Sequence, residues 1–272
     1  MYMLNNIIWK TLWDQRRSLS WWSIGFAGLI ISIMLFYPFF IENIDSYAGL
    51  LQDASDDPLM RIFAGGDLLD MASPAGFINV ELMAFMVPLL YVAFAITTGS
   101  AAIAGEESRG TLDFLLSNPV TRRQIILQKY GAMVGGVVIL TLINVASFGV
   151  GVVIVNMEIN FWRIVEATIS TGLLGLVFGA MAFSLGATFG KRGVSVGITS
   201  GVAVGSYLLH ALGPLVEWLK PFTKISPFYY QDQVDMTKAG LDPLHTAFFV
   251  FAGILFLSIS VVFFERRDIG LG

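Results

Sequence analysis

The distribution of charged side chains constrains this chain more than any other feature. Its 16 basic and 20 acidic residues are all absent from six windows of 22 to 28 residues, which are 18–41, 82–105, 130–157, 167–190, 193–216 and 243–264. A helix rises about 1.5 Å per residue, so 22 residues extend roughly 33 Å, enough to cross about 30 Å of hydrocarbon. The pattern predicts an all-α polytopic membrane protein with six transmembrane helices.

The composition agrees with this prediction and excludes several classes of protein. Hydrophobic residues make up 56% of the chain, whereas globular proteins contain about 45–50% apolar residues even with glycine counted. The net charge of −4 provides no basic field for nucleic acid. There is no cysteine, and His210 and His245 are the two histidines. We therefore expect a lipid bilayer as surroundings, no nucleic-acid partner, no thiolate site, no disulfide, and no ordinary zinc site built from His and Cys.

Counting Lys and Arg in the connecting segments predicts the orientation. With six spans both termini share one side, and that side carries eleven basic residues against five on the other, which are Arg61, Arg163, Lys220, Lys224 and Lys238. Both termini are therefore predicted to be cytoplasmic. The first window exceeds the 7–15 apolar residues of a typical signal peptide, so we expect it to remain as an anchor.

The segments outside the windows divide the single transmembrane domain, residues 1–272. Residues 1–17 are amphipathic and are predicted to form an interfacial helix on the inner leaflet, with a plain extension of the first span as the alternative. Residues 42–81 form an outer loop with short surface helices, or alternatively a substrate gate. Residues 217–242 form a second outer loop, in which Pro221 and Pro227 exclude one continuous helix.

The most informative segment is the loop 106–129, which begins EESRGTLDFLLSNPVTRRQ. Glu106 to Leu116 has the pattern of one amphipathic helix that ends before Pro119. Thr121 and Gln124 have the spacing of a capping box for the helix that follows. This predicts a compact helix, turn and helix at the membrane surface, whose charged ends are available to another protein; an ordinary solvated turn is the alternative. Those charged residues are Glu106, Glu107, Arg109, Arg122 and Arg123.

This loop resembles the signature loop of the type 2 ATP-binding-cassette exporter permeases. The residues that match the family pattern are Glu106, Glu107, Gly110, Thr111, Leu112, Leu115, Leu116, Pro119, Val120, Arg122 and Lys129. The chain length, the six spans and the SPFYY stretch at 226–230 are also similar to this family.

The resemblance implies a membrane subunit that performs no chemistry itself. In this family the loop, here including Arg109, forms a coupling helix that docks on a separate ATPase subunit, present in two copies, and two permeases pair as a homodimer or with a homologue. ATP and Mg²⁺ would be bound by that partner. The sequence agrees, because its nearest approach to a phosphate-binding G-x-x-x-x-G-K-[ST] loop, GATFGKR at 186–192, has the wrong spacing and places Arg192 at the Ser/Thr position. The implied location is the plasma membrane of a bacterium or archaeon.

Glycines recur every four residues in the fifth window, at Gly193, Gly197, Gly201 and Gly205. Such a face lets another backbone approach closely. Packing within the chain and contact with a second permease are the two interpretations.

The polar residues inside the six windows are all uncharged. Ion-coupled carriers usually keep an ionisable side chain at membrane depth, so this pattern favours an energy source outside the membrane. Asn144 and Ser147 are candidate cavity residues, with helix-to-helix hydrogen bonds as the commoner role. We expect an exporter of an amphipathic or hydrophobic substrate, such as a drug, lipid or peptide, that works by alternating access. The alternatives are an ion- or copper-related permease, an ATP-independent channel or carrier, and a non-transporting scaffold.

Overall fold

All regular structure in the described part of the chain is helical. The computed structural model describes residues 7–57, 60, 68–117, 119–231 and 240–267. In chain order, the elements are α1 (Ile7–Glu42), α2 (Ile44–Asp56), η1 (Leu68–Ala72), α4 (Pro74–Ile78), η2 (Asn79–Met83), α5 (Met86–Ala102), α6 (Ala104–Ser108), α7 (Leu112–Leu116), α8 (Arg122–Ile154), α9 (Phe161–Phe189), α10 (Arg192–Leu212), η3 (Gly213–Leu215), η4 (Lys220–Ile225), η5 (Pro227–Gln231) and α12 (Pro243–Arg266).

Six helical stretches of 24 to 36 residues are long and apolar enough to cross a membrane, which confirms the predicted number of spans. They are Ile7–Glu42, Pro74–Ala102, Arg122–Ile154, Phe161–Phe189, Arg192–Leu215 and Pro243–Arg266. Each predicted window lies largely inside one of these stretches, and most stretches extend past the window into charged residues. Charges at helix ends reach the headgroup region, so a helix does not have to stop where its charge-free window stops.

The second span differs most from its predicted window. It begins at Pro74 rather than at residue 82 and includes Glu81 within a π-helical turn, η2, that joins α4 to α5. At its other end, α5 stops at Ala102 and residue 105 already belongs to α6. Ser73 begins the helix, because its hydroxyl oxygen accepts a hydrogen bond from the Gly76 N–H at 3.0 Å.

The N-terminal segment also differs from the prediction. From Ile7 onwards it is continuous with the first span in one helix, α1, and is not a separate interfacial helix; residues 1–6 lie outside the described part. No proline or glycine interrupts residues 7–24, so the backbone hydrogen bonds continue without a break. The segment packs along α8, where the Ile7 N–H donates to Gln128 Oε1 at 2.7 Å.

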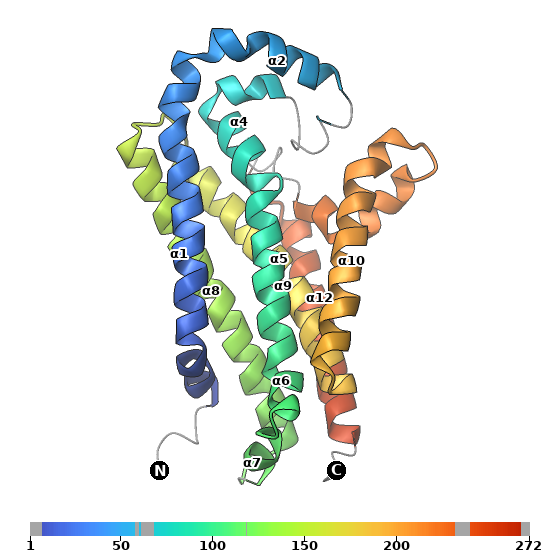
Figure 1. The fold of residues 1–272 in the computed structure, drawn as a ribbon. Coiled ribbons are helices and arrows are strands. Elements are labelled where there is room, and N and C mark those ends of the chain that lie inside the picture. Colours follow the sequence, from blue (N-terminus) through green and yellow to red (C-terminus); the bar gives the residue numbers. More distant parts are fainter. Residues whose placement is uncertain (1–6, 58–59, 61–67, 118, 232–239, 268–272) are drawn as a thin grey trace.

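The helices form one bundle with α9 at its centre (Figure 1). This helix packs against α5, α8, α10 and α12, and α1 packs against α8. The first turns of α1, the last turns of α12, and α6 and α7 all lie at one end of the bundle, which we call the loop end. The helix α2 lies across the opposite end.

Glycines bring the central helices into contact. A Cβ atom added at Gly179 of α9 would lie 3.0 Å from Ala95 Cβ of α5, and one at Gly175 would lie 3.2 Å from the carbonyl oxygen of Tyr91. Both distances are shorter than an ordinary van der Waals contact, so the two helices pack closely at these glycines. Gly131 and Gly135 of α8 face side chains of α1 instead, because Cβ atoms there would lie 3.3 Å from Ile8 Cδ1 and 3.5 Å from Leu12 Cδ1.

At the end opposite the loop, short elements close the bundle, as the sequence predicts. Phe40, Met71 and Phe77 are buried together beneath α2 and η1. In the 217–242 segment, the described elements are the short helices η4 and η5 rather than one long helix. Phe228 of η5 is buried against the bundle, and Gln231 Nε2 donates to Thr171 Oγ1 of α9 at 3.2 Å.

Candidate coupling interface

The loop 106–129 folds as two short helices, α6 and α7, where one helix over Glu106 to Leu116 is predicted. The break lies at Gly110, whose φ of 67° is in the left-handed region that favours glycine. The Thr111 N–H turns back to the Glu106 carbonyl oxygen at 2.9 Å, and the Thr111 hydroxyl donates to the same oxygen at 3.1 Å. Gly110 is therefore needed for the direction in which α7 leaves α6.

The predicted capping box is confirmed at the start of α8. The Gln124 N–H donates to Thr121 Oγ1 at 3.2 Å, and the Thr121 N–H donates to Gln124 Oε1 at 3.0 Å. Both exchanges satisfy amide groups that the first turn of a helix cannot satisfy internally. The cap fixes where the loop ends and the third span begins.

The apolar edge of the loop faces the bundle. Leu112 is only 1% exposed and lies in a buried cluster with Ile7 of α1, Ile125 and Ile126 of α8 and Phe264 of α12. Leu115 and Leu116 are half-buried against the same cluster. These leucines hold the loop against the loop end of the spans, so they are not its outward surface.

Most of the predicted charged residues are paired within the chain. Glu106 forms an ion pair with Lys129, which is buried on α8, and Glu107 forms one with Arg267, just after α12. Arg122 donates to the carbonyl oxygen of Arg267 and, at 3.3 Å, to that of Phe264. The loop is thereby connected to the last turn of α12.

Arg267 is the functional candidate that the sequence interpretation missed. Besides its ion pair with Glu107, its Nη1 donates to the carbonyl oxygen of Ala187 at 3.3 Å, near the C-terminal end of α9. Gly190, at φ 64°, ends α9 beside this cluster, and a side chain there would collide with both Arg267 and Glu107. The sequence marks Arg267 only as one of two arginines after the last span. Its partners lie 80 and 160 residues away.

Only some of the loop residues that match the family pattern lie on the surface of the molecule. The exposed residues are Ser108, Arg109, Gly110, Thr111, Ser117, Pro119, Thr121, Arg123, Gln124 and Leu127. Among the described side chains, Arg109 and Arg123 have no ion-pair partner, so both guanidinium groups remain available to another protein. The region around the turn at Gly110 is thus the part that can be contacted from outside the bundle.

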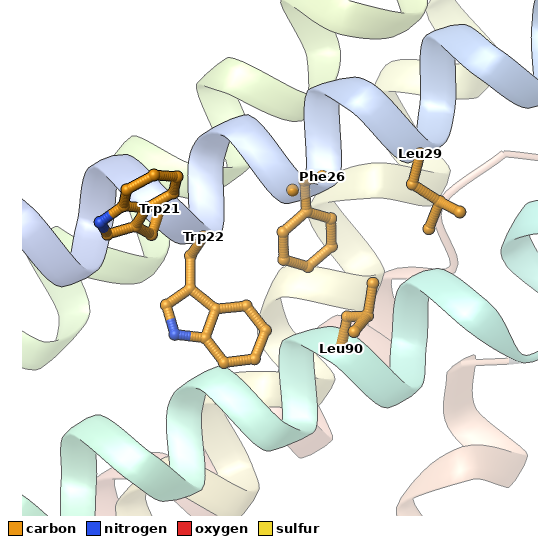
Figure 2. A pocket seen from close by; sticks show the side chains of 6 residues that line it. Trp21, Trp22, Phe26, Leu29 and Leu90 are labelled. Carbon is orange, nitrogen blue, oxygen red and sulfur yellow. The ribbon is translucent and has the colours of Figure 1, made fainter.

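Asn144 and Ser147 are buried inside the chain. Asn144 Nδ2 donates to the Leu140 carbonyl oxygen and Ser147 Oγ to that of Ile143, each at 2.8 Å and within α8. Neither lines the groove that the structure shows between α1 and α5, whose lining is Trp21, Trp22, Gly25, Phe26, Leu29 and Leu90 (Figure 2). Their role as cavity residues stays a prediction.

The glycine row of α10 is open. A Cβ atom at Gly193, Gly197, Gly201 or Gly205 would have no atom within 4 Å. The row therefore does not serve helix packing within the chain, which was one of the two interpretations. The close glycine contacts are on α9 and α8 instead.

Five spans packed around or beside the central span α9, with a compact helical loop at one end, define a multi-pass membrane protein. A sequence model of the ABC-2 family transporter proteins matches residues 5–269, and the chain belongs to this family.

The chain is also similar to a curated relative, the probable ABC transporter permease protein NosY of Stutzerimonas stutzeri. The two are 33% identical over 147 residues, which cover 51% of this chain. The match spans about half the length of that relative, also 51%.

Proposed function

We propose that this permease exports an amphipathic or hydrophobic substrate, such as a drug, lipid or peptide, by alternating access. A separate ATPase subunit, in two copies, hydrolyses ATP with Mg²⁺ and contacts the loop around Gly110. The observation that carries the proposal is how the loop is connected. Its outer turn is exposed, while Glu106 pairs with Lys129 of α8. Glu107 pairs with Arg267 at the end of α12, which in turn donates to a carbonyl oxygen of α9. A push on the exposed turn is thereby passed to three spans.

The docking surface is tested by reversing an exposed charge on the loop. Arg109→Glu is expected to reduce co-purification of the ATPase subunit about thirtyfold, because removing one partner of a buried interfacial charge pair costs about 2 kcal/mol or more. The matched control is Lys10→Glu, which reverses an exposed charge on α1 near the same end of the bundle. Quantitative pull-down of the ATPase measures both variants. Equal binding by Arg109→Glu and Lys10→Glu would place the docking surface elsewhere.

We also propose that the loop end faces the cytoplasm of a bacterial or archaeal cell and that the chain lies in the plasma membrane. The excess of Lys and Arg at that end supports this orientation. In intact cells, Cys at Asp56 is expected to react with an impermeant maleimide and Cys at Arg109 to react only after lysis. Both positions are exposed, and the chain has no other cysteine. Labelling of Arg109→Cys before lysis would reverse the orientation.

A second permease copy is proposed to pack on the open glycine row of α10. The row exposes backbone at four glycines spaced by four residues, and no side chain in the described part of the chain covers it. Two helices approach most closely in a membrane where both present small residues. A homodimer in which the two α10 helices meet would cover these glycines.

The substrate class is tested by stimulation of ATP hydrolysis in the reconstituted complex. Amphipathic drugs, phospholipids and apolar peptides are expected to stimulate hydrolysis. Cu⁺ and Na⁺ belong in the same series, because an ion- or copper-related permease is the alternative. Stimulation by an ion and by none of the amphipathic compounds would favour that alternative. Transport that persists without the ATPase would favour a channel or carrier.

A further inference from the structure

The open groove between α1 and α5 has features of a binding site. It has a volume of about 450 Å³ and an almost entirely apolar lining, within the range of about 300–1,000 Å³ that ligand pockets occupy. Gly25 is part of its lining, and a Cβ atom there would meet nothing within 4 Å. Phe26, which is 1% exposed, forms its floor.

The wall of the groove is an aromatic cluster with fixed neighbours. Trp22 contacts Phe94 edge-on, with ring centroids 5.7 Å apart, and Phe26 contacts Tyr91 at 5.1 Å. Leu29 and Leu90 continue the lining beyond Phe26, on the side away from the tryptophans, as Figure 2 shows. The surface is thus apolar along its length and held in place from behind.

One end of the groove is polar. Figure 2 shows the indole nitrogens of Trp21 and Trp22 on the side of their rings away from Phe26 and Leu29. Neither indole N–H has a hydrogen-bond partner among the described residues, and Trp21 is 74% exposed. Arg17 lies four residues before Trp21, one helical turn and about 6 Å along the same face of α1. It is the last charged residue before the first charge-free window, so it lies at headgroup depth.

Arg17 is available to a ligand, whereas its neighbour Arg16 is not. Arg17 is exposed and has no ion-pair or hydrogen-bond partner among the described residues. The Arg16 guanidinium donates to the Trp13 carbonyl oxygen at 2.8 Å and lies 4.6 Å from the Trp13 ring centroid. The two arginines therefore form a natural pair for comparison.

We propose that this groove binds a phospholipid with an anionic headgroup from the leaflet at the loop end. The acyl chain lies along Phe26, Leu29 and Leu90, and the phosphate accepts hydrogen bonds from Arg17 and the Trp21 indole. Arg provides paired donors for a phosphate, and anionic lipids are concentrated in the cytoplasmic leaflet. The inference rests on the proposed cytoplasmic orientation of the loop end.

The glycine row of α10 from a second permease copy would fit this groove less well than a phospholipid does. Its end nearest the loop carries Lys191 and Arg192. Placed in the groove with the same orientation in the membrane, these charges would lie at the depth of Arg17, and like charges at close range are unfavourable. A lipid phosphate at that depth is favourable.

The test uses the purified full-length permease without its ATPase, so that loss of coupling and loss of lipid binding are separate results. The probes are phosphatidylglycerol and phosphatidylcholine, each with a photoactivatable diazirine on one acyl chain, and labelled peptides are mapped by mass spectrometry. Phosphatidylglycerol is expected to label residues 21–29 about fivefold more than phosphatidylcholine, the preference that one cationic side chain near the surface provides.

Two variants and their matched controls decide the outcome. Arg17→Gln is expected to remove the fivefold preference, and Arg16→Gln to keep it. Gly25→Leu is expected to block labelling by both lipids, while Gly28→Leu, where a Cβ atom also meets nothing within 4 Å, leaves it unchanged. The thermal midpoint of each variant shows whether it is folded. If Gly25→Leu does not fold, Trp21→Ala is used in its place.

The proposal is overturned if labelling of residues 21–29 survives in Gly25→Leu, or if Arg17→Gln and Arg16→Gln behave alike. It is also overturned if Gly25→Cys cross-links efficiently to a cysteine placed in α10 of another copy, since a protein helix would then occupy the groove. A reversed orientation in the cysteine-labelling experiment would instead refute the assignment of the lipid to the cytoplasmic leaflet. That result would not depend on whether the lipid binds.

Discussion

Replacing Gly179 with Leu is expected to destabilise the permease by about 3 kcal/mol, the upper part of the usual range for overpacked cores. A Cβ atom at this position would lie 3.0 Å from Ala95 Cβ, 3.2 Å from the Ala95 carbonyl oxygen and 3.3 Å from the sulfur of Met133. Backbone atoms cannot move aside as the end of a flexible side chain can. The substitution must therefore separate α9 from α5, the two helices at the centre of the bundle.

The measurement is the thermal midpoint of unfolding of the detergent-purified protein, with loss of the monodisperse peak as the readout. A loss of 3 kcal/mol corresponds to a decrease of roughly 6–12 °C for a chain of this size. Failure to obtain any monodisperse protein would be the stronger form of the same result. An unchanged midpoint would show that α5 and α9 are not in direct backbone contact.

Gly201→Leu is the matched control, because it adds the same side chain to another glycine of a four-residue repeat. A Cβ atom at Gly201 meets nothing within 4 Å, so the thermal midpoint of the monomer is expected to stay within about 2 °C. The proposed pairing through α10 is expected to be lost, as judged by cross-linking in membranes. Pairing that persists in Gly201→Leu would place the second copy on another face, while leaving the contrast in stability intact.

The two glycine rows show what sequence can and cannot reveal here. A repeat every four residues indicates that a backbone is accessible on one face of a helix, and this holds for α9 and α10 alike. Which row packs inside the chain depends on how each helix is rotated in the bundle. That rotation is determined by contacts with residues distant in sequence, such as Ala95 with Gly179.

The six spans could be predicted because the thickness of hydrocarbon imposes a length on every apolar helix. The capping box of Thr121 and Gln124 could be predicted because both of its hydrogen bonds are local. The ends of the spans could not be predicted, because charged residues near the membrane surface are tolerated within helices. Glu81, for example, lies inside the second span. The partners of the charged loop residues could not be predicted either, because Arg267, the partner of Glu107, lies 160 residues away in the sequence.

Arg267→Gln is expected to reduce ATP-driven transport about tenfold while binding of the ATPase subunit stays within twofold. Arg267 joins Glu107 of the loop to the Ala187 carbonyl oxygen of α9, and its own carbonyl oxygen accepts a hydrogen bond from Arg122. The substitution removes the contacts made by its side chain and keeps the one made by its backbone. The exposed turn at Gly110 remains available for docking, but its movement is no longer passed to α9.

The size of this effect follows from the surroundings of the ion pair. The side chains of Arg267 and Glu107 are 19% and 28% exposed, between a surface pair worth up to about 1 kcal/mol and a buried pair whose loss costs about 3–5 kcal/mol. A loss of about 1.4 kcal/mol corresponds to a factor of ten in an equilibrium between coupled and uncoupled loop positions. Transport and ATPase binding are measured on the same reconstituted complex.

Two further variants separate a coupling role from a general loss of stability. Arg266→Gln removes an adjacent, exposed arginine of α12 and is expected to transport at the wild-type rate. Exchanging the charges, as Glu107→Arg with Arg267→Glu, is expected to recover part of the transport lost in either single variant. Recovery is incomplete because a glutamate at 267 cannot donate to the Ala187 carbonyl oxygen. Equal loss in Arg266→Gln and Arg267→Gln, or loss of ATPase binding in step with transport, would contradict this role for Arg267.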